Sequence, residues 1–68
     1  MTLDGSAVGR RIVVRHETGG VGPSGGPELS DVIGRVVAVD DQSVTVELRD
    51  GRFREVAITT IVTWKPVP

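Results

Sequence analysis

The stretch Ser43–Ile58, SVTVELRDGRFREVAI, decides the fold of this chain. In its first half Val44, Val46 and Leu48 alternate with polar residues, the period-two pattern of a strand with one face in water. Asp50-Gly51 then follows, a pair that readily takes positive φ in a tight turn. A second run with apolar residues closes the stretch. These features predict an antiparallel β-hairpin.

Two registers fit this hairpin, and they place Phe53 on opposite faces. A two-residue loop pairs Phe53 with Leu48 inside the fold, but a bulge near Arg54-Glu55 must then turn Val56 inward. A three-residue loop with Gly51 in the left-handed conformation needs no bulge, but it leaves Phe53 in solvent. Burial of a phenylalanine is worth roughly 1.5–3 kcal/mol. Because the chain has one phenylalanine, we expect the first register.

The rest of the chain predicts further short strands and turns. It has 68 residues with nine glycines and four prolines, and no window shows apolar residues at helical spacing. We expect strands at residues 10–16, 32–40 and 62–65, and a single helical turn at Thr59-Thr60-Ile61 before the last strand. The fold class is therefore all-β, a small five-stranded SH3-like barrel. An OB-fold would normally need longer strands and a helix.

The segments outside the strands have distinct compositions. Residues 1–9 are polar and without pattern, which predicts a flexible N-terminal lead-in. Residues 17–28 are rich in glycine and proline, so a long glycine-rich first loop is expected there. The barrel would then occupy residues 10–65, and residues 66–68 would begin a linker or C-terminal tail, since Pro66 stops a strand.

Composition narrows the classes of function. Eight Lys and Arg against nine Asp and Glu give a formal net charge of −1, so no overall field attracts nucleic acid or a membrane. The chain has no cysteine, and its single histidine, His16, is more often a surface residue than a ligand or base. We expect no catalytic constellation, no metal site, no cofactor and no enzyme activity in this chain alone. Without a long apolar run, we expect a cytoplasmic protein with no membrane contact.

The hairpin carries three candidate nucleic-acid contacts: Arg49, Arg52 and Arg54. If these arginines gather on the solvent-exposed face of the hairpin, they could contact RNA phosphates. Proteins that stack on RNA bases use aromatic side chains, and this chain has few of them. In the expected register Glu47 also lies across from Arg54, and this charge pair would neutralise part of the face.

Trp64 is the main candidate for contact with a protein partner. It can close one end of the barrel, or it can contact a partner or a following domain, since tryptophan is enriched at interface hot spots. Phe53 is a second candidate for partner contact. A proline-rich peptide groove and a methyl-lysine cage both need more aromatic residues than the chain has.

The assembled segments resemble a known domain family. They are residues 8–15 (VGRRIVVR), 29–37 (LSDVIGRVV), 43–46 (SVTV), Asp50-Gly51 and 64–68 (WKPVP). Together they look like the N-terminal SH3-like domain found ahead of some actinobacterial GNAT-type N-acetyltransferases, and LSDVIG and KPVP are the most specific parts. The resemblance covers residues 8–68. It implies the barrel fold and an accessory role, while acetyl-CoA binding and catalysis belong to a C-terminal domain.

The sequence thus predicts a non-catalytic SH3-like accessory domain of a GNAT-type N-acetyltransferase. It would position the C-terminal acetyltransferase domain or recruit another protein. The alternative is a small RNA- or ribosome-binding barrel that uses the arginines of the hairpin. The oligomeric state, the acyl acceptor and the identity of the partner stay open.

Overall fold

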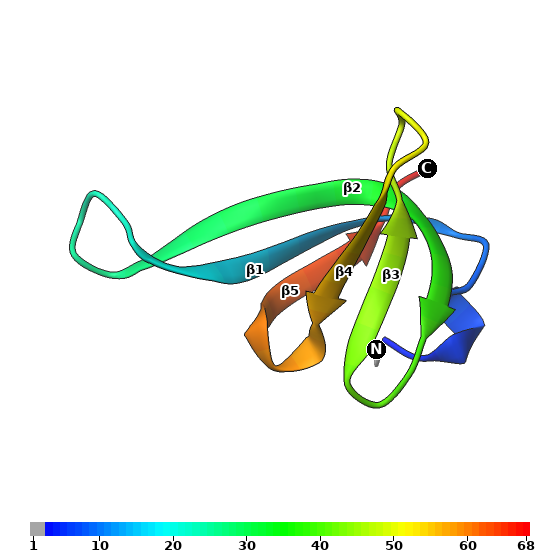
Figure 1. Ribbon diagram of the computed structural model, residues 1–68, viewed down its shortest axis with the longest axis horizontal. Coiled ribbons are helices and arrows are strands. Elements are labelled where there is room, and N and C mark those ends of the chain that lie inside the picture. The colour runs from blue at the N-terminus through cyan, green and yellow to red at the C-terminus, as the bar shows by residue number, and fades with distance from the viewer. Residues whose placement is uncertain (1–2) are drawn as a thin grey trace.

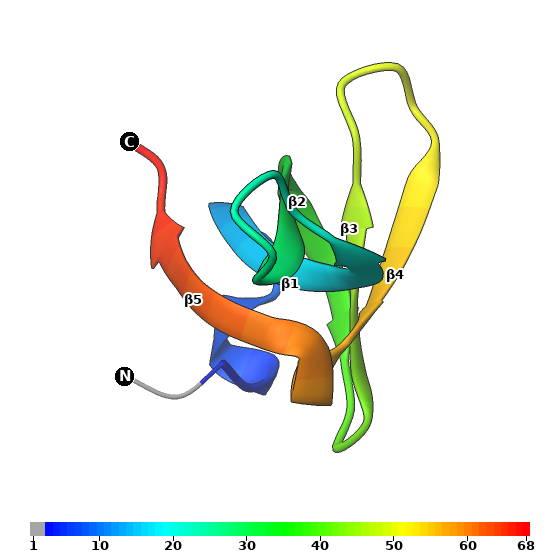
Figure 2. The same cartoon turned by 90° about the vertical axis from the view of Figure 1, so that its left-hand side faces the viewer.

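The computed structural model describes residues 3–68 as five antiparallel strands in one curved sheet (Figure 1). The strands are β1 (Arg11–Val21), β2 (Pro27–Val39), β3 (Ser43–Glu47), β4 (Phe53–Ala57) and β5 (Ile61–Pro66), with short 3-10 turns η1 (Gly5–Ala7) and η2 (Ile58–Thr60). Their order in the sheet is β4-β3-β2-β1-β5. Figure 2 shows the sheet curling round, with η2 joining its two edge strands. The predicted all-β barrel-like class, with one helical turn before the last strand, is confirmed.

The core lies inside the curled sheet and consists almost entirely of branched aliphatic side chains. Its members are Ala7, Ile12, Val14, Val32, Val36, Val44, Val46 and Val56. Ala7 lies in η1, and the other members occupy alternate positions of their strands, because successive side chains of a strand point to opposite faces. In the described part of the chain no polar or charged residue is buried. A core this small leaves the domain with only a few kcal/mol of net stability.

At Gly34 the backbone of β2 lies close to the backbone of β3. A Cβ atom at Gly34 would meet the carbonyl oxygen of Glu47 and would lie 3.1 Å from its carbonyl carbon. Beyond this point the β2–β3 register shifts between Val36 and Ala38, and β2 bends strongly in Figure 1. The bend lets one strand serve both halves of the barrel.

The connection between the first two strands is glycine-rich, as expected, but much shorter than expected. Both strands continue into the 17–28 segment, so only residues 22–26 form the turn. Gly22 N–H donates to the carbonyl of Gly26 over 2.7 Å, and Thr18 Oγ1 donates to Glu28 Oε1 over 2.5 Å. The resulting hairpin arm, residues 17–29, projects from the barrel (Figure 1). Both faces of the hairpin arm are exposed to solvent, so its sequence shows no alternation of apolar and polar residues.

The segment expected to be a flexible lead-in packs against the sheet over its described residues, 3–9. Asp4 caps η1, because its Oδ1 accepts the Ser6 N–H at 2.9 Å. Ala7 is buried in the core, and Gly9 N–H donates to the carbonyl of Val36 at 2.8 Å. Residues 1 and 2 of the predicted lead-in lie outside the described residues.

The turn between β3 and β4 is the three-residue loop. Leu48 N–H donates to the carbonyl of Arg52 at 2.7 Å, and Gly51 N–H donates to the carbonyl of Leu48 at 3.0 Å. Gly51 has φ +87, the left-handed conformation that glycine adopts without steric cost. The two-residue loop expected from the sequence is wrong.

The loop length sets the register, and the register turns Phe53 outward. Val44 pairs with Val56, Glu47 pairs with Phe53, and no bulge interrupts the hairpin. Phe53 is 64% exposed instead of packed against Leu48. The predicted bulge near Arg54-Glu55 is therefore also wrong. The physical reason is that this register buries the hairpin valines together without breaking the ladder, which outweighs the burial of one phenylalanine.

Candidate functional site

One row of side chains crosses the outer face of four adjacent strands. Arg11 of β1 lies directly across from Arg35 of β2, Arg35 lies across from Glu47 of β3, and Glu47 lies across from Phe53 of β4. Directly opposed residues in an antiparallel sheet have Cβ atoms about 4.5–5.5 Å apart. The register thus places two guanidinium groups, one carboxylate and one aromatic ring in line.

Glu47 forms an ion pair with Arg35 and not with the residue expected from the sequence. Arg35 Nη2 donates to Glu47 Oε1 at 2.8 Å. The sequence predicts Glu47 across from Arg54. In the structure Arg54 pairs with Val46, so the Arg54 side chain lies on the opposite face of the hairpin. This correction follows directly from the register of the turn.

A hollow of about 470 Å³ opens beside this row. Its lining residues come from the segment before β1, from β1, β2 and β3, and from the β3–β4 turn: Gly9, Arg11, Arg35, Glu47, Leu48, Arg49 and Gly51. We call this hollow the arginine hollow. Three of its seven lining residues are arginines, so the hollow is basic.

The three arginines proposed from the sequence do not gather in one place. Arg49 lines the arginine hollow. Arg52 stays in the turn, where its Nε lies 3.7 Å from Asp50 Oδ2, and Arg54 is exposed on the other face. The structure instead brings Arg49 together with Arg11 and Arg35. Only the cross-strand register reveals this grouping, because Arg11 and Arg35 are far apart in sequence.

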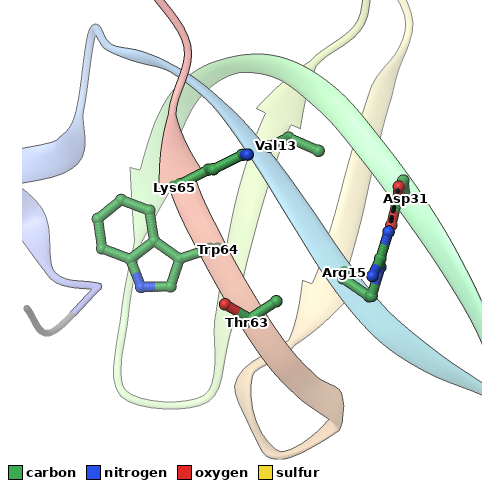
Figure 3. Close-up of a pocket in the computed structure, with 6 residues that line it drawn as sticks. All are labelled: Val13, Arg15, Asp31, Thr63, Trp64 and Lys65. Carbon is green, nitrogen blue, oxygen red and sulfur yellow. Dashed lines mark hydrogen bonds and ion pairs between the residues drawn. The ribbon is translucent and has the colours of Figure 1, made fainter.

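A second hollow, of about 310 Å³, lies where β1, β2 and β5 meet (Figure 3). Its lining residues are Val13, Arg15, Asp31, Thr63, Trp64 and Lys65. Arg15 forms two hydrogen bonds to Asp31, from Nε to Oδ1 at 2.9 Å and from Nη2 to Oδ2 at 3.2 Å. These hydrogen bonds lower the pKa of the Asp31 carboxyl and raise the pKa of the Arg15 guanidinium. In this hollow Arg15 and Asp31 therefore satisfy each other's charge.

Trp64 and Phe53, the two candidate partner contacts, differ in exposure. The indole of Trp64 lies on the other side of β5 from the side chains of Thr63 and Lys65 (Figure 3), where it packs half-buried against the core. Phe53 is 64% exposed on an edge strand. The geometry favours Phe53 as the freer of the two contact surfaces.

His16 is half-buried near the junction of β1 with β5. Its Nδ1 lies 3.1 Å from the carbonyl of Glu17, and its Nε2 is buried without a partner among the described residues. Within residues 3–68, no three His, Cys, Asp or Glu side chains cluster closely enough to hold a metal ion. Over the same residues, no helix is long and apolar enough to cross a membrane.

The family of the chain follows from a match that spans nearly all of this architecture. Residues 6–65 match the model of the Rv0428c N-terminal Sm-like domain. The chain belongs to this family. The family description names a small Sm-like domain and mentions no enzymatic activity. No curated protein and no solved structure gave a significant match. The matched range begins inside the segment expected as a lead-in, in keeping with the packing of Ala7 into the core.

Proposed function

We propose that this Sm-like domain is a non-catalytic accessory module that holds a GNAT-type N-acetyltransferase domain, in the same polypeptide or in a second one. The observation that carries the proposal is the exposure of Phe53. The chain's one phenylalanine is 64% exposed on β4. Covering such a ring is worth roughly 1.5–3 kcal/mol, and aromatic anchors dominate many protein interfaces.

The kind of partner rests on the family and on the resemblance in sequence. The family description refers to an N-terminal domain, which fits a module that precedes other domains. The segments LSDVIG and KPVP resemble those ahead of acetyltransferase domains of the GNAT type. Since the domain offers a contact surface without a cluster of catalytic groups in the described residues, positioning is the role that suits it best.

The first test is association in solution. The ¹⁵N-labelled domain is titrated with the unlabelled acetyltransferase domain encoded downstream of codon 68 or nearby in the genome. We expect saturable shifts of the β4 amides around Phe53. Phe53→Ala should weaken the association about tenfold or more, because about 1.4 kcal/mol corresponds to a factor of ten.

Val21→Ala is the matched control, since Val21 is also exposed, at 74%, but lies at the tip of the hairpin arm. It should leave the affinity unchanged. A genome with no acetyltransferase reading frame continuous with or beside this one would refute the proposed partner. An affinity that Phe53→Ala does not change would refute the proposed contact.

A further inference from the structure

We propose that the arginine hollow binds a phosphate monoester. This inference goes beyond the accessory role and does not depend on it, because the hollow and the Phe53 contact share no residue. The ligand class is defined by its chemistry: a compact, doubly charged oxyanion whose oxygens accept several N–H donors.

The first argument is that the fold holds two arginines directly opposite each other, which is electrostatically unfavourable. Arg11 and Arg35 lie directly opposite each other on neighbouring strands, and like charges in this arrangement destabilise a sheet. Arg49 adds a third guanidinium from the β3–β4 turn. An anion seated among the three would convert this repulsion into attraction. Such a ligand would bind the folded chain in preference to the unfolded chain and stabilise it.

The second argument is the charge of the lining. Three arginines contribute three positive charges and Glu47 contributes one negative charge, so the hollow carries a net charge of +2. A phosphate monoester has a second pKa of about 6 and is mainly a dianion at neutral pH. The charges of site and ligand therefore match, whereas a single carboxylate or one phosphodiester group would neutralise only half of the site.

The third argument is that donors and space remain for a ligand. Arg35 uses Nη2 for Glu47, and a guanidinium has five N–H donors. Within residues 3–68, no carboxylate lies within ion-pairing distance of Arg11 or Arg49. Arginine forks bind phosphate oxygens in pairs, with short charge-assisted hydrogen bonds.

The glycines of the hollow leave room for the ligand. Gly9 and Gly51 both line it, and a Cβ atom built at either position would find nothing within 4 Å. The space that a side chain would fill is therefore open at both glycines. Both also have positive φ, so replacement by residues with larger side chains is disfavoured there.

The test is a titration of the whole 68-residue chain at low chloride and about pH 7.5, where the dianion predominates. The probes are inorganic phosphate, a nucleoside 5′-monophosphate, and one oligonucleotide with and without a 5′-phosphate. Arginine Nε–Hε and backbone amide resonances are followed by NMR. We expect saturable shifts at Arg11, Arg35 and Arg49 and at the amides of Gly9 and Gly51.

Arg11→Gln is the decisive variant. It should weaken phosphate binding about tenfold, the usual effect of losing a hydrogen bond to a charged group. Without phosphate it should be at least as stable as the parent chain, since it removes the repulsion with Arg35. At the same phosphate concentration the parent chain should gain more in Tm than the variant. A purely structural arginine would show the opposite, a variant that is less stable in both conditions.

Arg54→Gln is the matched control, because it removes the same charge from the opposite face of the hairpin. Equal weakening by Arg11→Gln and Arg54→Gln would overturn the proposal, as would shifts that never saturate. Equal binding of the two oligonucleotides would overturn the monoester specificity. Among positive outcomes, equal affinity for inorganic phosphate and the nucleotide identifies free phosphate as the source. Tighter binding of the nucleotide identifies a phosphorylated organic ligand.

Discussion

Gly34 is the residue whose replacement should cost most, because its neighbour is backbone and cannot rotate away. A Cβ atom there would collide with the carbonyl group of Glu47. We expect Gly34→Ala to lower the free energy of unfolding by about 3 kcal/mol, the upper range for an overpacked site. Gly5→Ala is the control, since a Cβ at Gly5 meets nothing within 4 Å. Guanidinium denaturation of both variants tests this expectation, and equal midpoints would show that β2 and β3 can separate without cost.

We expect the barrel to stay folded when the hairpin arm is deleted. Every residue of the arm is exposed or half-buried, and a two-stranded ribbon alone is marginally stable. Replacing residues 18–28 with Asn-Gly would join Glu17 to Leu29, which already face each other. We expect the free energy of unfolding to change by less than about 1 kcal/mol, since a surface change of this kind removes no core contact. Denaturation midpoints measure it. A loss of cooperative unfolding in the shortened chain would instead make the arm part of the folding unit.

The elements also show which parts of the structure the sequence could predict. Alternation of Val44 and Val46 with polar residues was enough to place the central hairpin and the class of fold. Register was not accessible in this way, because it depends on the sum of all cross-strand contacts. The expected register favours the burial of one phenylalanine, whereas the structure keeps the hairpin ladder unbroken. The arginine hollow was missed for the same reason, since Arg11 and Arg35 meet only through the β1–β2 register.

At the scale of the whole molecule, three exposed aspartates should make the free energy of unfolding depend on pH in the acid range. Side-chain and backbone hydrogen bonds from Ser6 lower the pKa of Asp4. The hydrogen bonds from Arg15 lower the pKa of Asp31. Hydrogen bonds from the backbone N–H groups of Gln42 and Ser43 lower the pKa of Asp40. A carboxyl whose pKa is lower in the folded chain than in the unfolded chain stabilises the fold. This contribution is fully present when the pH is above the pKa of aspartate in the unfolded chain, about 3.9. That contribution is lost as the pH falls through the folded pKa. We therefore expect a flat stability profile near neutrality and a decline below about pH 4.

The variant Asp40→Asn tests the origin of this decline. Asparagine can still accept the hydrogen bonds that Gln42 and Ser43 donate to Asp40 Oδ1 at 2.8 Å, but it does not titrate. Its stability should therefore fall less steeply with acid than that of the parent chain, as measured by denaturation between about pH 2 and 7. Asp41→Asn removes the same charge one residue away without touching these hydrogen bonds, so it controls for the loss of charge alone. Parallel curves for the parent chain and Asp40→Asn would mean that the turn before β3 makes no pH-dependent contribution and that the acid sensitivity arises elsewhere in the molecule.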